Sequence, residues 1–172
     1  IKILTTLLQP TSGKILVNGH NPTSEQNEVR RSFGIVFQDP SLDDELTAYE
    51  NMEIHGVLYD VPKDVGKTRT EQLLKLVDLW DRKNDFVKNF SGGMKRRLEI
   101  ARALATDPKL LALDEPAAGM NATETAALRT LVEGLRADGL TVLLIEHDVK
   151  LVMGLCDRVA VLDYGEMIAE DV

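Results

Sequence analysis

The chain has 172 residues, of which 44% are hydrophobic, and this suits one globular domain with a buried core and room for a smaller subdomain. Its 28 acidic residues outnumber 20 lysines and arginines, and the formal net charge of -8 argues against nucleic acid as a partner, because phosphate binding needs clustered positive charge. The single cysteine, Cys156, has no partner for an internal disulfide, so a reducing cytoplasm is the expected location. No apolar run approaches the roughly 20 residues that cross a bilayer.

The first part of the chain predicts one helix and two strands. Apolar residues recur at helical spacing between Ile1 and Leu8, so a helix is expected there. The sequences KILVNG, at residues 14–19, and FGIVF, at residues 33–37, are typical of strands. Because the chain starts within the expected helix and without methionine, we expect that an upstream segment has been lost.

From residue 47 to about residue 83 the pattern becomes helical, which predicts a helical subdomain. Beyond it, helices and strands alternate. Alternation of this kind predicts an α/β fold, with a parallel sheet covered by helices. The expected elements are helices at 94–106, 123–137 and 149–155 and strands at 110–113, 141–145 and 159–162, followed by a turn into a further short strand.

Three of the expected strands end in polar side chains. Gln38 follows the second strand, Asp114 and Glu115 end the third, and the Glu-His-Asp sequence at 146–148 ends another. Ligands of open parallel sheets bind beyond the carboxyl ends of the strands. One carboxylate there can hold Mg²⁺ and a second can activate water, while Gln38 and His147 can reach the metal, the water or a terminal phosphate. The pattern predicts a phosphoryl-transfer site.

The turn formed by Ser91, Gly92 and Gly93 supplies a complementary part. Ser91 is a natural helix N-cap, the glycines allow close approach of a ligand to the backbone, and the helix that follows presents free N–H groups to an anion. That helix is about 20 Å long at 1.5 Å per residue and separates Ser91 from Glu115. A phosphate on Ser91 is therefore expected to belong to a second site, supplied by another copy of the protein.

Each feature also has a simpler explanation. The Ser-Gly-Gly turn could be an ordinary capped helix start, the adjacent carboxylates a solvated strand end, and His147 a surface histidine between acids. Four basic residues of the same helix are most simply its solvent-exposed face: Lys95, Arg96, Arg97 and Arg102. The joint order and spacing of the features favour the functional interpretation.

In order along the chain, the features resemble the nucleotide-binding subunit of ATP-binding cassette (ABC) transporters, over essentially the whole sequence. Gln38 is similar to the Q-loop glutamine, FSGGM at residues 90–94 to the signature LSGGQ, and LLALDE at residues 110–115 to the Walker B strand. His147 matches the switch histidine. The resemblance implies a P-loop NTPase-like parallel sheet with an inserted helical subdomain.

The resemblance also implies roles for these residues. Glu115, His147 and Gln38 would be catalytic. Asp114 and Gln38 would hold Mg²⁺, and ATP would contact these two residues and the turn Ser91–Gly93. Two such subunits, identical or different, would sandwich ATP and drive an integral-membrane permease from the cytoplasmic side, peripheral on the inner face of the cell membrane.

The P-loop pattern G-x-x-x-x-G-K-[ST] is not found at the expected position. Gly13-Lys14 is followed by Ile15, and Leu8 stands where the first glycine would be. Residues 1–8 instead resemble the helix that follows a P-loop. The sequence is thus expected to be truncated at its N-terminal side, and the chain as given is expected to be inactive although its complete parent is an ATPase.

Other departures concern the branch of the family. Phe90 and Met94 replace the commoner Leu and Gln of the signature, and the D-loop carries Asn121. The N-terminal half is similar to drug-resistance-type exporters and the C-terminal half to branched-chain amino-acid importers. The direction of transport, the substrate, the permease and a common origin of the two halves therefore stay open.

The expected division is a core remnant with the Q-loop at 1–46, a helical subdomain at 47–88, and the signature, Walker B and switch-histidine part at 89–172. Two alternatives remain beside the transporter subunit. One is a non-transport ABC ATPase of translation or DNA repair, and the other is a non-catalytic subunit that lends only its signature surface to a partner.

Overall fold

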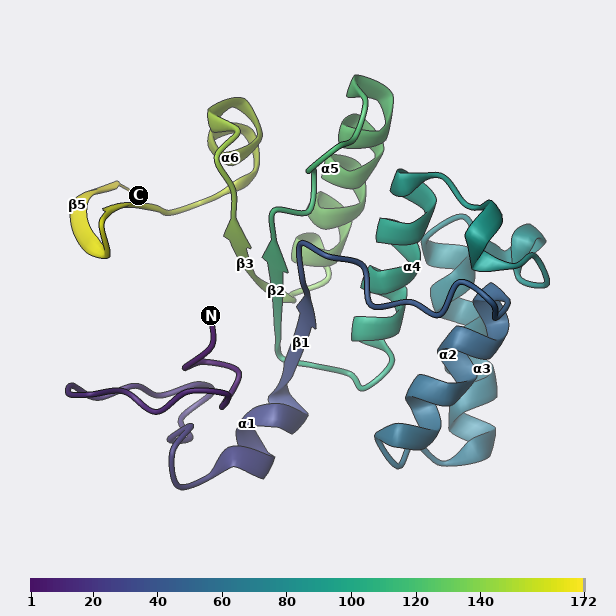
Figure 1. Ribbon diagram of the computed structural model, residues 1–172, viewed down its shortest axis with the longest axis horizontal. Coiled ribbons are helices and arrows are strands. Elements are labelled where there is room, and N and C mark those ends of the chain that lie inside the picture. Colours follow the sequence, from purple (N-terminus) through teal and green to yellow (C-terminus); the bar gives the residue numbers. More distant parts are fainter. Residues whose placement is uncertain (172) are drawn as a thin grey trace.

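A three-stranded parallel sheet forms the centre of the computed structural model, which describes residues 1–171 (Figure 1). The strands are β1 (Phe33–Val36), β2 (Leu110–Asp114) and β3 (Thr141–Ile145), in the spatial order β1-β2-β3. Both neighbouring pairs are parallel, and helices lie between the paired strands in sequence, as parallel connections require. The α/β class and the parallel sheet predicted from the sequence are confirmed.

Helices α4 (Gly92–Leu104) and α5 (Ala122–Ala137) cover one face of the sheet, and α6 (Val149–Leu155) packs against α5 (Figure 1). Successive residues of a strand point to opposite faces. Leu111 and Leu113 of β2 are accordingly buried against these helices. This cluster forms the core between the sheet and these helices.

The opposite face of the sheet is covered by the N-terminal part of the chain. Ala112 of β2 packs there with Val17, Val29 and Phe33. Val29 belongs to α1 (Gln26–Ser32), which leads directly into β1. This helix was not predicted, because its seven residues are mostly polar and contain a single apolar residue, which is too little for a helical pattern.

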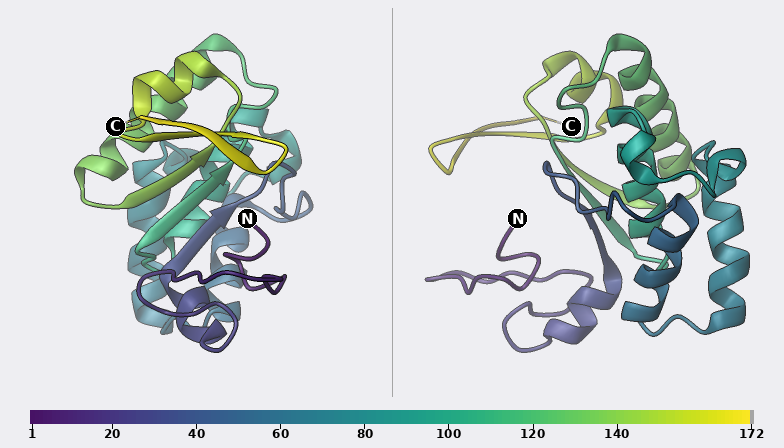
Figure 2. Two further views of the ribbon diagram at one scale, coloured as in Figure 1. Left: turned by 90° about the vertical axis from the view of Figure 1, so that its left-hand side faces the viewer. Right: turned by 45° about the vertical axis from the view of Figure 1, so that its right-hand side comes forward.

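A second helical layer packs on the far side of α4 (Figure 2, right). It consists of α2 (Ala48–Leu58), α3 (Lys63–Leu76) and two 3₁₀ turns at 80–82 and 87–89. Thr47 and Glu50 form a capping box at the start of α2. None of the helices within residues 1–171 is long and apolar enough to cross a membrane.

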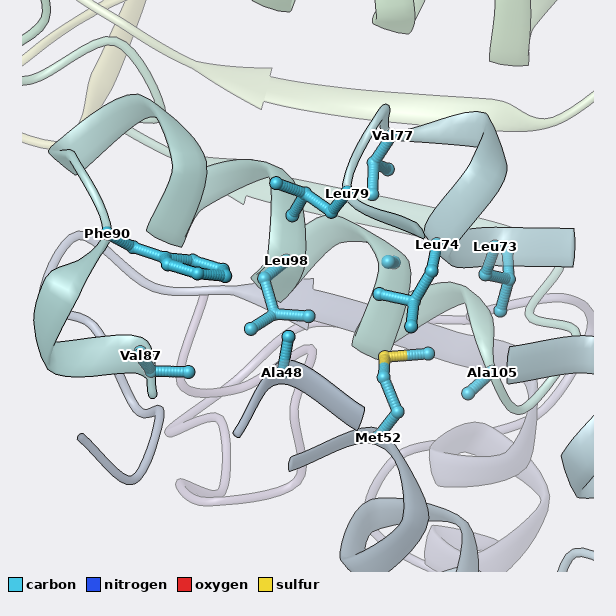
Figure 3. Packing of buried hydrophobic residues seen from close by; sticks show 11 residues of the cluster. Ala48, Met52, Leu73, Leu74, Val77, Leu79, Val87, Phe90, Leu98 and Ala105 are labelled. Atoms are coloured by element: carbon cyan, nitrogen blue, oxygen red, sulfur yellow. The ribbon is translucent and has the colours of Figure 1, made fainter. Parts of the chain in front are cut away.

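This layer has its own apolar core, shown in Figure 3. Met52 of α2, Leu74 of α3 and Leu98 of α4 are almost completely buried in it. Phe90, the first residue of the FSGGM sequence, is buried in the same cluster. The start of α4 is therefore anchored to the helical layer.

Two predicted N-terminal elements are not formed. Residues 1–8 make turns: the amides of Leu7 and Leu8 both donate to the carbonyl of Lys2, and an isolated helix of this length is marginal in water. Residues 14–19 contain only one antiparallel bridge, between Val17 and His20. The Asn18-Gly19 pair between them has positive φ at both residues, which folds the chain into a tight turn before a strand can extend.

The strand predicted at 159–162 is formed, but outside the parallel sheet. β4 (Val159–Asp163) pairs antiparallel with β5 (Glu166–Asp171) in a hairpin that projects from the sheet (Figure 2). A two-residue loop, Tyr164-Gly165, has positive φ at both positions, as a type I′ turn requires. Because of this tight turn, β4 pairs with β5, the next strand in the sequence, and not with the parallel sheet.

Candidate functional site

Gln38 and Glu115 meet at the carboxyl end of the sheet. The register pairs Val36 of β1 with Leu113 of β2, so two residues further along each strand the side chains of Gln38 and Glu115 lie opposite each other. The Nε2 atom of Gln38 donates a hydrogen bond of 2.9 Å to Oε2 of Glu115, across 77 positions of sequence. Parallel pairing brings these two predicted residues to the same edge of the sheet.

His147 reaches the same carboxylate from β3. The amide of Glu115 donates to the carbonyl of Ile145 at 2.9 Å, which extends the β2–β3 pairing by one residue. Nδ1 of His147 then lies 3.7 Å from Oε1 of Glu115, and its imidazole is 78% exposed. Gln38, Glu115 and His147 thus share one edge of the sheet, as the sequence predicted.

Glu115 has an unusual backbone. Its φ of 45° lies in the left-handed region, which costs a residue other than glycine on the order of 1–3 kcal/mol. β2 ends at Asp114, and residues 116–119 form a turn directly after Glu115. The Glu115 amide bonds to Ile145 of β3, and its carboxylate accepts from Gln38, which follows β1.

Asp114 is the last residue of β2 and is partly buried. Within residues 1–171 its carboxylate makes no hydrogen bond or ion pair, so its oxygens are available to a ligand. No group of three or more His, Cys, Asp or Glu residues in the described chain forms a ready metal site. One carboxylate is nevertheless enough for Mg²⁺, which keeps several waters and binds with nucleotide phosphates.

The turn before α4 holds a carboxylate of the chain itself. Oγ of Ser91 accepts from the amide of Met94 and donates to Oε1 of Glu124 at 2.9 Å. The amide of Gly93 donates to the same oxygen at 3.3 Å. The hydrogen bond from Ser91, followed by that from the Asn121 backbone, lowers the pKa of Glu124. The turn therefore prefers a negatively charged partner.

Gly93 allows this contact through its lack of a side chain. A Cβ atom there would lie 2.7 Å from Oε1 of Glu124. Sequence reasoning missed Glu124. Its local signal, the N-x-x-E pattern of a capping box with Asn121, is present, but it points only to the start of α5 and not to Ser91.

The length of α4 is not a measure of the distance between Ser91 and Glu115 in the fold. α4 runs in the opposite direction to β2, so its N-terminal end lies toward the same edge of the sheet as the end of β2 (Figure 1). Arg96, little more than one turn from Ser91, donates to the carbonyl of Pro116. Length along a helix therefore does not measure separation in space where the following strand returns beside it.

The four basic residues of α4 are not a free solvent face. Arg96 is only 5% exposed. The other three bind the helical layer and the segment after β1, because α4 lies between that layer and the sheet: Lys95 to Asp44, Arg97 to the carbonyl of Val77 and Arg102 to the carbonyl of Ser41.

A second Gly-Lys pair, Gly66-Lys67, is followed by Thr68, as in a P-loop, and sequence reasoning missed it. Val61 stands where the first glycine of that pattern would be, and the three residues lie within α3. Most backbone N–H groups of a helix are used within the helix. This segment is therefore not a phosphate cradle.

The family model described as ABC transporter matches residues 1–118. The chain belongs to this family. It is 38% identical over 170 residues to the daunorubicin resistance ATP-binding protein DrrA3 of Streptomyces coeruleorubidus, covering 99% of this chain and 54% of the relative. It is 39% identical over 176 residues to the methionine import ATP-binding protein MetN of Escherichia coli, covering 99% of this chain and 51% of the relative. The chain thus spans about half the length of these relatives.

Solved ABC structures have the same fold. The structure of cbiO1 from Clostridium perfringens, part of the ABC transporter complex cbiONQ, matches with a TM-score of 0.89 and 30% identity, over 98% of this chain and 69% of that one. A dimeric ATP-binding cassette in a post-hydrolysis state with ADP and Pi matches with a TM-score of 0.83 and 28% identity, over 99% of this chain and 77% of that one. The sheet edge described above belongs to an ABC ATP-binding fold.

Proposed function

We propose that the chain provides ATP-binding and ATP-hydrolysing parts of an ABC transporter subunit. The observation that carries the proposal is the contact of Gln38 and His147 with Glu115 at the ends of three parallel strands, in a member of this family. One carboxylate with an amide donor on one side and an imidazole on the other suits orientation and deprotonation of a water molecule.

Each residue has a distinct proposed role. Asp114 would hold Mg²⁺ with help from Gln38, and the metal would offset charge on the ATP phosphates. Glu115 would accept the proton of the attacking water. His147, largely exposed, is placed to contact a terminal phosphate from the open side of the edge.

The Ser91–Gly93 turn would serve a nucleotide held by a second ABC subunit, identical or different. Support comes from its binding of the Glu124 carboxylate, which shows that two donors there converge on one anionic oxygen. The dimeric cassette among the similar structures gives a precedent for pairing.

The partner that uses the energy would be an integral-membrane permease, with the subunit peripheral on the inner face of the membrane. The helical layer offers an apolar surface for it: Val57 and Leu58 at the end of α2 are 71% and 74% exposed, beside a cavity of about 240 Å³ between α2 and α3. Both a drug-resistance protein and methionine importers are similar along this whole chain, so export and import are equally compatible.

Residues 1–172 by themselves are proposed to bind Mg-ATP weakly, because they contain no G-x-x-x-x-G-K-[ST] sequence. Hydrogen bonds to charged groups contribute roughly 1.5–3 kcal/mol each, and three or four of them amount to about 5–10 kcal/mol. Calorimetric titration of this polypeptide with Mg-ATP should show millimolar or weaker binding. Micromolar affinity would contradict this part of the proposal.

The catalytic role is tested by Glu115→Gln in this chain joined to the P-loop segment of MetN. The expected result is retained ATP binding and a loss of hydrolysis of about 10²–10⁴-fold, the usual contribution of a general base. Glu71→Gln, on the exposed surface of α3, is the matched control and should hydrolyse ATP normally. A Glu115→Gln rate within a few-fold of the control would exclude the role.

Two other functions are separated by the bound partner. Purification from the source cell with a multi-span membrane protein supports transport, whereas ribosomes or DNA would support a translation or repair ATPase. A non-catalytic subunit would instead show no effect of Glu115→Gln on the activity of its complex.

A further inference from the structure

Arg96 in the middle of α4 is a buried cation that none of the roles above uses. Its side chain contacts the backbone at the ends of two strands. Nε donates to the carbonyl of Pro116 at 3.1 Å, Nη2 donates to the carbonyl of Gln38 at 3.0 Å, and Nη1 donates to the carbonyl of Phe37. The guanidinium therefore joins the residues that follow β1 to the residue that follows Glu115.

The charge of Arg96 is balanced by Glu99, one turn further along α4. Nη1 of Arg96 lies 3.1 Å from Oε2 of Glu99, and the two side chains are 6% and 2% exposed. The other oxygen of Glu99 accepts from the amide of Ser41 at 2.8 Å. A buried charge is costly unless it is paired and hydrogen-bonded, and this pair meets both conditions. Together the two residues hold α4 to the segment 37–41.

These contacts join the two chain segments that carry Gln38 and Glu115. Gln38 and Glu115 lie on separate strands, and the 2.9 Å bond between their side chains is at an exposed edge. The Arg96 guanidinium holds the backbone of Gln38 on one side and that of Pro116, next to Glu115, on the other. We propose that Arg96 is a positioning residue that keeps Gln38 against Glu115 and connects α4 to the catalytic edge. The effect of this positioning on ATP hydrolysis rests on the proposed function, whereas the hydrogen bonds of Arg96 do not depend on it.

The chemistry of the side chain explains why arginine is needed. A guanidinium presents five N–H donors in a rigid plane, whereas lysine offers one ammonium on a flexible stem and glutamine has one NH₂ group. Neither replacement can hold three carbonyls and a carboxylate in the same geometry. Arg96→Lys keeps the charge beside Glu99 and so isolates the loss of geometry.

The test uses residues 1–172 and follows the side-chain amide signal of Gln38 by NMR. Glu115→Ala removes the acceptor and defines the signal of the free side chain. Arg96→Lys and Arg96→Gln are expected to move the Gln38 signal most of the way to that free position. Arg69→Gln is the matched control, since Arg69 of α3 also donates to a backbone carbonyl, that of Ala105, without touching the segment 37–41 or either strand end. In this control the signal should stay at the wild-type position.

An unchanged Gln38 signal in folded Arg96→Lys would overturn the proposal. Arg96→Lys serves as the decisive variant if Arg96→Gln does not fold, because it retains the buried ion pair. In the P-loop-bearing chain described above, Arg96→Lys should lower kcat by at least tenfold with KM for ATP unchanged, while Arg69→Gln leaves both constants within about twofold. Equal kcat values for Arg96→Lys and for the control variant would count against a positioning role of Arg96. Absence of hydrolysis in the P-loop-bearing chain without any further substitution would count against the proposed function, and the NMR result would still decide the role of Arg96.

Discussion

At the scale of single residues, one carboxylate, that of Glu124, connects the starts of two helices. Oε1 of Glu124 accepts from Ser91 and Gly93 at the start of α4, while Oε2 accepts from the amide of Asn121, the N-cap of α5. The hydroxyl of Ser91 has a single proton, and Glu124 already accepts it. A phosphate that binds to Ser91 and Gly93 must therefore displace this internal carboxylate.

Glu124→Ala is expected to lower the melting temperature at neutral pH, because it removes the acceptor of both helix starts. The pKa of Glu124 is lowered in the folded state, so its stabilisation is present above the unfolded pKa of about 4.5 and is lost as pH falls through the folded value. Thermal unfolding of both proteins at several pH values should show the difference shrinking below pH 4.5. Glu133→Ala, which removes an exposed carboxylate paired with Arg129 on the same helix, is the control and should have little effect. A Glu124→Ala difference that persists undiminished at pH 3 would show that the charge is irrelevant.

At the scale of elements, α4 and β1 approach each other closely at Gly34. A Cβ atom on this residue would lie 2.9 Å from the carbonyl oxygen of Ala103 and 3.1 Å from Cγ of Pro108. The absence of a side chain lets the end of α4 pack on the first strand. This contact brings α4 against β1, the strand that Gln38 follows.

Gly34→Ala is expected to reduce the free energy of unfolding by about 1–3 kcal/mol, as overpacking usually does. The control is Gly134→Ala in α5, where no atom lies within 4 Å of the added Cβ and where alanine should stabilise the helix by about 0.5–1 kcal/mol. Urea unfolding of the three proteins measures both effects. If the two substitutions gave changes of the same sign, close packing at Gly34 would not be the cause.

At the scale of the whole molecule, the candidate site has two separate halves. Gln38, Glu115 and His147 share one cluster of contacts, whereas Ser91 and Gly93 contact Glu124 instead. No hydrogen bond or ion pair in residues 1–171 links the two groups directly. This separation is consistent with a nucleotide placed between two subunits.

Ser91→Arg in the P-loop-bearing chain is expected to abolish ATP-driven dimerisation without weakening ATP binding to the monomer. The larger cation would block the turn against a second subunit but lies away from the subunit's own Glu115. Sedimentation measures the dimer and calorimetry the monomer's affinity, with Ser24→Arg on the exposed N-terminal segment as control. A fall in the monomer's own affinity would show that Ser91 acts within its own subunit.

The strands of the sheet and the polar residues at their ends could be read from the sequence, because apolar runs and the residues that follow them are local features. Parallel pairing then placed Gln38, Glu115 and His147 at one edge without further information. Local pattern was insufficient for residues 1–8, which form turns, and for residues 14–19, where the Asn18-Gly19 turn reverses the chain. It was insufficient also for β4, which pairs with β5 through a two-residue turn.

The sequence by itself determined the family, the α/β class and the candidate catalytic residues. Only the tertiary structure decided what surrounds them. Arg96 has the sequence pattern of a solvent-facing helical residue, and Glu124 that of a helix cap. Both make their decisive contacts with residues 20 to 59 positions away. Such contacts depend on which faces two elements present to each other. The packing of α4 between the helical layer and the sheet sets those faces, and the residues next to Arg96 and Glu124 in the chain do not.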